Sequence, residues 1–191
     1  MSGKYIVLDR DGVINHDSKD YIKSPEEWHA IKGSLEAIAR LTRADYRVVV
    51  ITNQSGIGRG MYSINTLNRI HQKLLDQLQI LGGEVSAFFF CPHAPDDNCP
   101  CRKPKPGMFI DMARRLRIDL HEVIAVGDSL RDIQASVAAG AKPALVRTGN
   151  GSSTLAAIEQ DDALSSLREV PVFDDLSQFA SKLLAGETSF S

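Results

Sequence analysis

The chain has 191 residues, of which 43% are hydrophobic, and its formal net charge at pH 7 is −2. This length suits a single domain, which we expect over residues 1–191, and the apolar content is enough for one core. A nearly balanced charge argues against a nucleic-acid partner, because nucleic-acid-binding surfaces carry a basic excess. The sequence shows no signal peptide and no apolar run near the roughly 18 residues of a membrane helix. We therefore expect a cytoplasmic monomer that contacts no membrane and acts on a small molecule.

Apolar strands alternate with amphipathic helices along the chain. Short runs of β-branched and apolar side chains predict strands over residues 5–8, 46–51, 85–90, 123–126, 144–146 and 170–173. Apolar residues at helical spacing predict helices over residues 34–42, 64–78, 108–116, 130–139 and 176–184. Such an alternation is typical of a parallel sheet covered on both faces, so we expect a doubly wound α/β domain. Residues 15–34 form a polar loop whose length indicates a function.

Chemically active side chains follow four of the predicted strands. Asp9, Thr52, Cys91 and Asp128 each stand at or just after a strand end. Doubly wound sheets bind ligands beyond the carboxyl ends of their strands, at the point where the strand order reverses. We therefore expect these residues to converge, although they are far apart in the sequence.

Two acidic pairs indicate a site for a divalent cation. Asp9 and Asp11 lie two residues apart after the first strand, and Asp128 and Asp132 lie one helical turn apart after the fourth. A surface turn is the simple alternative for the first pair taken alone. An EF-hand loop is excluded, because Ile14 stands where that loop needs a glycine. Together the two pairs supply the hard oxygen ligands that suit Mg²⁺.

The same region offers positive charge and hydrogen-bond donors for a phosphoryl group. Mg²⁺, the Thr52 hydroxyl and the Lys103 ammonium would surround such a group, although a plain surface lysine is the default interpretation of Lys103. The sequence has neither a Walker loop nor the dinucleotide pattern G-x-G-x-x-G, so nucleotide binding has no support. We expect phosphoryl transfer in which Asp9 attacks phosphorus and forms an aspartyl-phosphate. Asp11 would donate a proton to the leaving alcohol and later take one from water.

All three cysteines lie in one segment, residues 91–103, together with a histidine. The pairs Cys91-x-His93 and Cys99-x-Cys101 supply three thiolates and an imidazole, the donors of a closed tetrahedral Zn²⁺ site. The alternative is a set of free or paired cysteines. A disulfide between Cys99 and Cys101 would however be strained, and it would leave Cys91 as an unpaired thiol. Because no ligand position remains for water, we expect the zinc to be structural.

Four short motifs resemble those of the haloacid-dehalogenase-like (HAD) phosphatases: DRDGVI at residues 9–14, ITNQSG at 51–56, CRKP at 101–104 and GDSLRD at 127–132. The resemblance spans residues 4–132 and implies a HAD-like Rossmannoid sheet. The cysteine loop is similar to that of the histidinol-phosphate and heptose-bisphosphate phosphatases, which carry zinc there and lack a large cap domain. Residues 53–60, NQSGIGRG, look more like the heptose-bisphosphate side of this group. A phosphorylated sugar substrate is implied, and a role in making ADP-heptose for bacterial lipopolysaccharide.

The resemblance also implies roles for individual residues. The reaction itself is assigned to a nucleophile, a proton donor and two phosphoryl-stabilising groups, which fall on Asp9, Asp11, Thr52 and Lys103. Magnesium would be held by Asp9, the backbone carbonyl of Asp11, and Asp128, with Asp132 behind them. Substrate recognition falls on Asp17, Ser18, Lys19, Asp20, Asn53, Gln54, Ser55, Arg102 and Ser129.

Other functions fit parts of this pattern. A histidinol-phosphate phosphatase would share the four motifs and the cysteine loop. A phospho-accepting receiver module also combines aspartate, threonine, lysine and Mg²⁺ on a doubly wound sheet, but it has no need of a proton-transferring residue such as Asp11. A zinc-stabilised binding protein without chemistry would leave Asp9 and Asp128 unexplained.

Overall fold

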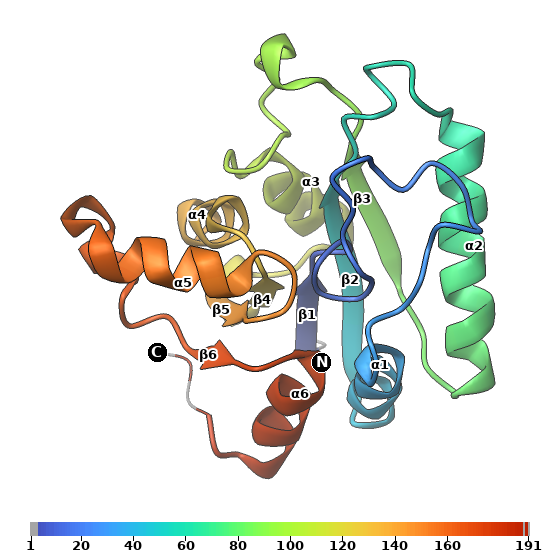
Figure 1. Cartoon of the computed structure of the whole chain (residues 1–191). Helices are drawn as coiled ribbons and strands as arrows, with labels where there is room; N and C mark the ends of the chain where they lie inside the picture. The colour runs from blue at the N-terminus through green and yellow to red at the C-terminus, as the bar shows by residue number, and fades with distance from the viewer. Residues whose placement is uncertain (1–3, 189, 191) are drawn as a thin grey trace.

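Six parallel strands form one sheet in the order β3-β2-β1-β4-β5-β6 (Figure 1). The computed structural model describes residues 4–188 and residue 190. The strands are β1 (Lys4–Leu8), β2 (Tyr46–Asn53), β3 (Ala87–Cys91), β4 (Ile124–Gly127), β5 (Lys142–Val146) and β6 (Val172–Phe173). Because β2 and β3 lie on one side of β1 and β4 to β6 on the other, the strand order reverses between β1 and β4. The predicted doubly wound fold is confirmed, and its ligand position lies at the carboxyl ends of these two strands.

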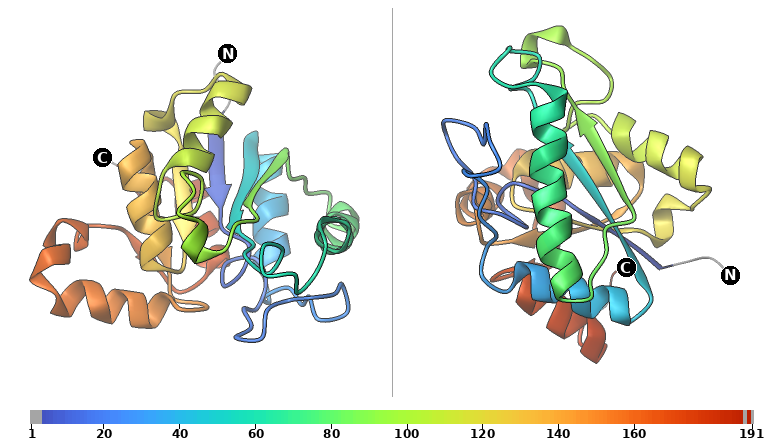
Figure 2. Two further views of the ribbon diagram at one scale, coloured as in Figure 1. Left: turned by 90° about the horizontal axis from the view of Figure 1, so that it is seen from above. Right: turned by 90° about the vertical axis from the view of Figure 1, so that its right-hand side faces the viewer.

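Helices cover both faces of the sheet (Figure 2). One face carries α1 (Ser34–Arg43), α2 (Ile64–Ile80) and α6 (Leu176–Ala185). The other carries α3 (Gly107–Leu116) and α4 (Leu130–Ala139), with α5 (Gly151–Gln160) packed beside α4 over β5. Side chains along β1 point alternately to the two faces of the sheet. Ile6 and Leu8 pack in the core beneath α1, α2 and α6, whereas Tyr5 and Val7 pack in the core on the α3 side. Short 3₁₀ helices span Pro95–Asp97, Leu120–Glu122 and Asp162–Leu167.

The structure differs from the sequence-based elements in a few places. Helix α5 was not predicted, because its sequence opens with Gly, Ser, Ser and Thr, and its buried residues are just Gly151, Thr154 and Ile158. Strand β2 continues through Asn53, so Thr52 belongs to the strand rather than to the following loop. Strand β3 is shifted to end at Cys91, and β6 is reduced to two residues.

The long polar loop after β1 is fixed to the rest of the domain by hydrogen bonds and by a buried side chain. The Trp28 side chain is fully buried against the core. From α2, Lys73 Nζ donates to the backbone carbonyls of Pro25 at 2.6 Å and Trp28 at 2.9 Å. At the other end of the loop, Ser34 Oγ donates to the carbonyl of Ile14 at 2.6 Å. This loop carries no helix or strand in the described part of the chain, so it forms no cap domain.

Residues 4–188 and 190 contain no helix that is both long and apolar enough to cross a membrane.

Replacing Trp28 with alanine should lower the free energy of unfolding by about 3–5 kcal/mol, because it opens a large cavity where a fully buried ring packs. Denaturant titration followed by circular dichroism measures this loss. Ile80→Ala is the matched control, since Ile80 is 84% exposed and its truncation should change stability by less than about 0.5 kcal/mol. Equal effects of the two substitutions would contradict the role given to Trp28.

Candidate active site

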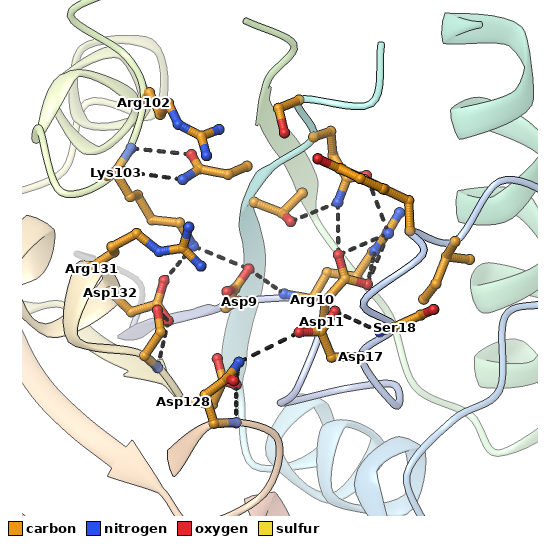
Figure 3. Close-up of a pocket in the computed structure, with 18 of the residues that line it drawn as sticks. Asp9, Arg10, Asp11, Asp17, Ser18, Arg102, Lys103, Asp128, Arg131 and Asp132 are labelled. Atoms are coloured by element: carbon orange, nitrogen blue, oxygen red, sulfur yellow. Dashed lines mark hydrogen bonds and ion pairs between the residues drawn. The ribbon is translucent and has the colours of Figure 1, made fainter. Parts of the chain in front are cut away.

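A cavity of about 340 Å³ opens at the carboxyl edge of the sheet (Figure 3). Its lining brings together the residues predicted to carry the reaction, namely Asp9, Asp11, Thr52, Lys103, Asp128 and Asp132. The predicted convergence of strand ends is therefore confirmed for β1, β2 and β4. Cys91 is the exception, because its side chain lies outside the cavity in a separate cluster of cysteines.

The Lys103 ammonium lies at the centre of the buried charges. Lys103 is 3% exposed, and its Nζ lies 3.1 Å from Asp9 Oδ1 and 2.6 Å from Asp132 Oδ1. It also donates to the carbonyl of Ile51 in β2 at 2.9 Å. Burial alone would lower the pKa of Lys103, but the carboxylates of Asp132 and Asp9 outweigh it and raise that pKa. The lysine is therefore a fixed positive charge beside Asp9, not the surface lysine of the default interpretation.

Asn53 holds the backbone of Lys103 in place. Its Nδ2 donates to the Lys103 carbonyl and its Oδ1 accepts from the Lys103 amide, both at 3.1 Å. This reciprocal pair joins the end of β2 to the loop after β3. The side-chain amide predicted to bind substrate is thus engaged in positioning the lysine.

Three carboxylates meet at the switch point of the sheet. Ligand oxygens of Asp9, Asp128 and Asp132 lie within 4.8 Å of one another. Burial and the charge of Asp132 raise the pKa of Asp9 well above its ordinary value, and the same two causes raise the pKa of Asp128 to about 7. A single ammonium does not neutralise three buried carboxylates. The donor set and its excess negative charge fit a hard divalent cation.

The three carboxylates differ in the partners they already have. Asp132 Oδ2 accepts from the backbone amide of Ser129 at 3.0 Å and from its hydroxyl at 2.6 Å, while Oδ1 contacts Lys103. Burial opposes ionisation of Asp132, but the Lys103 ammonium and the two Ser129 donors hold its pKa below the ordinary value. Asp132 is therefore committed to Lys103 and to the start of α4. Asp9 and Asp128 are left as the carboxylates that can ligate a cation.

Asp128 is oriented by the helix that sequence reasoning missed. Its Oδ2 accepts from Asn150 N at 2.7 Å and from Asn150 Nδ2 at 3.1 Å, which leaves Oδ1 for a metal ion. Thr154 Oγ1 in α5 donates to the Asp128 carbonyl at 2.9 Å. Asn150 and Thr154 thus connect α5 to the acidic site.

Asp11 lies in a dense set of hydrogen-bond donors. Its carboxylate accepts from Arg10 Nε and NH2 at 2.9–3.0 Å, from Asn15 Nδ2 at 2.8 Å and from Gln54 Nε2 at 2.9 Å. Its side chain is 22% exposed toward the cavity, whereas that of Arg10 is 1% exposed. The Asp11 carboxylate, which is predicted to transfer protons, is therefore fixed by hydrogen bonds within the protein while part of its side chain remains accessible from the cavity.

The residues predicted to recognise substrate divide into two sets. Those in the cavity lining are Asp17, Ser18, Asn53, Gln54, Ser55, Arg102 and Ser129. Lys19 instead lines a neighbouring hollow with His16 and Thr148, and Asp20 is an exposed loop residue outside the described lining of both. Lys19 and Asp20 are exposed and occupy a turn between Asp17 and Ser18 on one side and Tyr21 and Ile22 on the other, all four of which line the cavity.

Sequence reasoning missed other residues of the lining, among them Arg59, Tyr62, Arg131 and Asn150. Arg131 follows Asp128 by three residues, so its place at the start of the next helix was an available signal. Arg59 and Tyr62 lie in and just after the glycine-rich segment 56–60. This segment has no helix or strand pattern from which the direction of a side chain could be predicted. Asn150 gave no signal, because the helix that it precedes was not predicted.

The cysteine loop brings four potential metal ligands together. Cys91, Cys99 and Cys101 have sulfur atoms 3.3–3.5 Å apart, and His93 Nδ1 lies 3.2 Å from the sulfur of Cys101. Disulfide sulfurs would be about 2.05 Å apart, so the three thiols are unbridged. Ligands 2.3 Å from a tetrahedral zinc ion lie roughly 3.8 Å from each other. The donor set and spacing therefore fit a metal ion with four protein ligands.

Fold and site together define a HAD-like hydrolase, and a family model described as HAD-hydrolase-like matches residues 100–177. The D-glycero-beta-D-manno-heptose-1,7-bisphosphate 7-phosphatase of Bordetella bronchiseptica is 60% identical over 153 residues, which are 80% of this chain and 86% of that protein. The enzyme of the same name from Pseudomonas putida is 48% identical over 181 residues, 95% of this chain and 99% of that one. The chain belongs to the family of these phosphatases.

A solved structure supports the same placement. The crystal structure of D,D-heptose 1,7-bisphosphate phosphatase from B. bronchiseptica, complexed with magnesium and phosphate, matches with a TM-score of 0.90 and 54% identity. The match covers 96% of this chain and 99% of that chain. The fold therefore extends over the whole length of the relative.

Gly12→Ala should weaken the binding of Mg²⁺ and abolish most Mg²⁺-dependent activity. Gly12 has a φ of +83°, and a Cβ there would collide with the Asp128 carboxylate, so the substitution must push a ligand aside. Calorimetric titration with Mg²⁺ measures the effect. Gly60→Ala is the control, because Gly60 has a φ of +69° but nothing within 4 Å of the added methyl. An unchanged Mg²⁺ affinity in Gly12→Ala would contradict this assignment.

Proposed function

We propose that the protein is a Mg²⁺-dependent phosphatase that removes the C7 phosphate of D-glycero-D-manno-heptose 1,7-bisphosphate through an aspartyl-phosphate on Asp9. The observation that carries the proposal is the setting of Asp9. Its Oδ1 accepts from the Arg10 amide at 2.7 Å and lies 3.1 Å from Lys103 Nζ, which leaves Oδ2 as the attacking oxygen. The names of the relatives support the substrate, and the magnesium and phosphate in the B. bronchiseptica structure support the cofactor and reaction.

The reaction proceeds in two displacements at phosphorus. Asp9 Oδ2 forms a bond to phosphorus while the bond to the C7 oxygen breaks, and Asp11 gives its proton to that oxygen. Asp11 then takes a proton from water, whose oxygen attacks the phosphorus and releases phosphate from Asp9. Lys103 and the Thr52 hydroxyl stabilise the phosphoryl oxygens. Mg²⁺, held by Asp9, Asp128 and the Asp11 carbonyl, would neutralise negative charge on the phosphoryl group when bound.

The rest of the cavity favours a substrate with a second anionic group. Arg59, Arg102 and Arg131 line it, and in residues 4–188 none of their side chains pairs with a carboxylate. Arg102 NH1 is moreover buried without a partner. Figure 3 shows Arg102 and Arg131 on the same side of the cavity as Lys103. These guanidinium groups suit the C1 phosphate of the bisphosphate, so the product would be a heptose 1-phosphate available for ADP-heptose synthesis.

The cysteine cluster is assigned to zinc with a structural role. Burial raises the pKa of Cys91 to about 12, while hydrogen bonds from the Cys101 thiol and the Arg102 amide overcome burial and lower that of Cys99 to about 7. A cation of soft character would draw all three thiols into the thiolate form. Since Arg102 and Lys103 directly follow Cys101, the zinc would fix the loop that carries two site residues.

Phosphate release over a panel of substrates tests the proposed function. With Mg²⁺ present, heptose 1,7-bisphosphate should be hydrolysed with a higher kcat/KM than heptose 7-phosphate and histidinol phosphate, and chelation of Mg²⁺ should stop the reaction. The substitution Asp9→Asn should reduce kcat at least about 10³-fold without unfolding the chain, because it removes the nucleophile but keeps the shape. Preference for histidinol phosphate would contradict the substrate. A stable phosphorylated protein without turnover would indicate a receiver instead.

Cys99→Ser should remove zinc and lower thermal stability while the remaining folded protein keeps a similar kcat. Metal content by mass spectrometry and the melting temperature measure the two losses. Asp96→Ser is the control in the same loop, since Asp96 is exposed and is not part of the cluster. A full complement of zinc in purified Cys99→Ser would refute its role as a ligand.

A further inference from the structure

Three residues of the cavity wall, Arg10, Gln54 and Tyr62, form a connected hydrogen-bond network. Gln54 Oε1 accepts from Tyr62 Oη at 2.6 Å and from Arg10 NH2 at 3.3 Å. We infer that this network positions the two groups that act on the substrate, the Asp11 carboxylate and the Thr52 hydroxyl. The inference deepens the proposed function and rests on it, because it assigns the residues that arrange the proton-transfer and phosphoryl-binding groups.

Gln54 is the link between these two groups. It is 3% exposed, and its Nε2 donates to Asp11 Oδ2 at 2.9 Å and to Thr52 Oγ1 at 3.0 Å. Both hydrogens of the amide nitrogen and both lone pairs of its oxygen are therefore occupied inside the protein. The side chain predicted to bind substrate has no group left for it. Its position suits alignment rather than recognition.

Tyr62 completes the hydrogen bonding of the Gln54 amide oxygen. The Arg10 guanidinium has no acceptor and so faces Oε1, whereas the Asp11 carboxylate accepts from Nε2, which together fix the orientation of the amide. The Tyr62 hydroxyl, whose pKa burial raises to about 12, then donates to the same Oε1. Gly56 makes this contact possible, because a Cβ there would collide with the Tyr62 ring.

Arg10 gives the network its charge. It is 1% exposed, and it contacts Asp11 through both Nε and NH2 as well as donating to Gln54. A paired arrangement of this kind fixes the plane of a carboxylate better than a lysine can. Figure 3 shows Arg10 and Asp11 side by side, with several dashed contacts between them.

The consequence for the site is a defined direction for each reacting group. Because Thr52 Oγ1 already accepts from Gln54, its own proton is available for a phosphoryl oxygen. Both oxygens of Asp11 accept hydrogen bonds from the protein, and its partly exposed side chain lines the cavity. Arg10, Gln54 and Tyr62 are thus positioning residues, and Tyr62 acts through Gln54.

Steady-state kinetics with two substrates test the network. The substrates are heptose 1,7-bisphosphate and p-nitrophenyl phosphate, which has no sugar and no second phosphate. Tyr62→Phe should lower kcat about threefold to tenfold on heptose 1,7-bisphosphate and should also lower it on p-nitrophenyl phosphate, with KM changed less than about twofold on both. Tyr46→Phe, at the opposite edge of the sheet, is the control and should leave kcat unchanged. Substrate recognition by Tyr62 would instead reduce kcat/KM for the sugar bisphosphate alone.

A double-mutant cycle tests the order of action. Gln54→Leu should lower kcat more than Tyr62→Phe does, because Arg10 still donates to the amide oxygen in the latter. The double variant should be no slower than Gln54→Leu alone, since Tyr62 acts through Gln54. Multiplied losses in the double variant, or an unchanged kcat in Tyr62→Phe while the unmodified enzyme turns over, would overturn the inference. An unmodified enzyme that releases no phosphate from either substrate would refute the proposed function itself.

Discussion

The buried ion pairs of Lys103 are the constraint on which the rest of the site depends. A buried ammonium is tolerated when opposite charges and hydrogen bonds surround it, and Lys103 obtains them from Asp9, Asp132 and the carbonyl of Ile51. These partners belong to the ends of β1 and β2 and the start of α4. Replacing Lys103 itself by a neutral side chain would leave these buried carboxylates without their ammonium partner. One side chain therefore joins three segments that are remote in the sequence.

The same arrangement leaves the site with an excess of negative charge. Asp9, Asp128 and Asp132 are close together, and burial raises the pKa of Asp9 and Asp128. Ordinary folding stability would favour fewer carboxylates at such a position. A divalent cation beside these carboxylates, as proposed above, would offset their negative charge. Clusters of buried carboxylates with raised pKa values are typical of functional sites.

Chemistry and selectivity come from different parts of the fold. Of the groups proposed to react, Asp9, Asp11 and Thr52 stand at or just after strand ends. The network of Arg10, Gln54 and Tyr62 is hydrogen-bonded to Asp11 and Thr52. The groups proposed to face the remainder of the substrate, Arg59, Arg102 and Arg131, lie in loops or at a helix start. The cysteine cluster, with the metal ion proposed for it, would stiffen the loop that precedes Lys103. Such a division lets the loops change substrate preference without disturbing the reaction.

The strands, the residues at their ends and the cysteine cluster were predictable, because each follows from a pattern of residues close together in the sequence. Continuous apolar runs predict buried strands because a parallel sheet is covered on both faces, and the residue that follows each run must then lie at the ligand edge. This reasoning placed Asp9, Thr52 and Asp128 correctly. The Cys-x-His and Cys-x-Cys pairs were equally readable, since ligands two residues apart reach a common point with little help from the rest of the fold.

What the tertiary structure decided were contacts between side chains far apart in the sequence. The Asn150 donors reach Asp128 because α5 packs beside α4, and that helix has too few buried residues to be read from periodicity. Tyr62 reaches Gln54 because Gly56, which has no side chain, leaves room for its ring. Lys19 and Asp20 show the converse, since nearness in sequence to Asp17 did not bring them to the cavity. Sequence by itself determined which chemical groups stand at the strand ends, whereas packing of loops and helices decided which way those groups face.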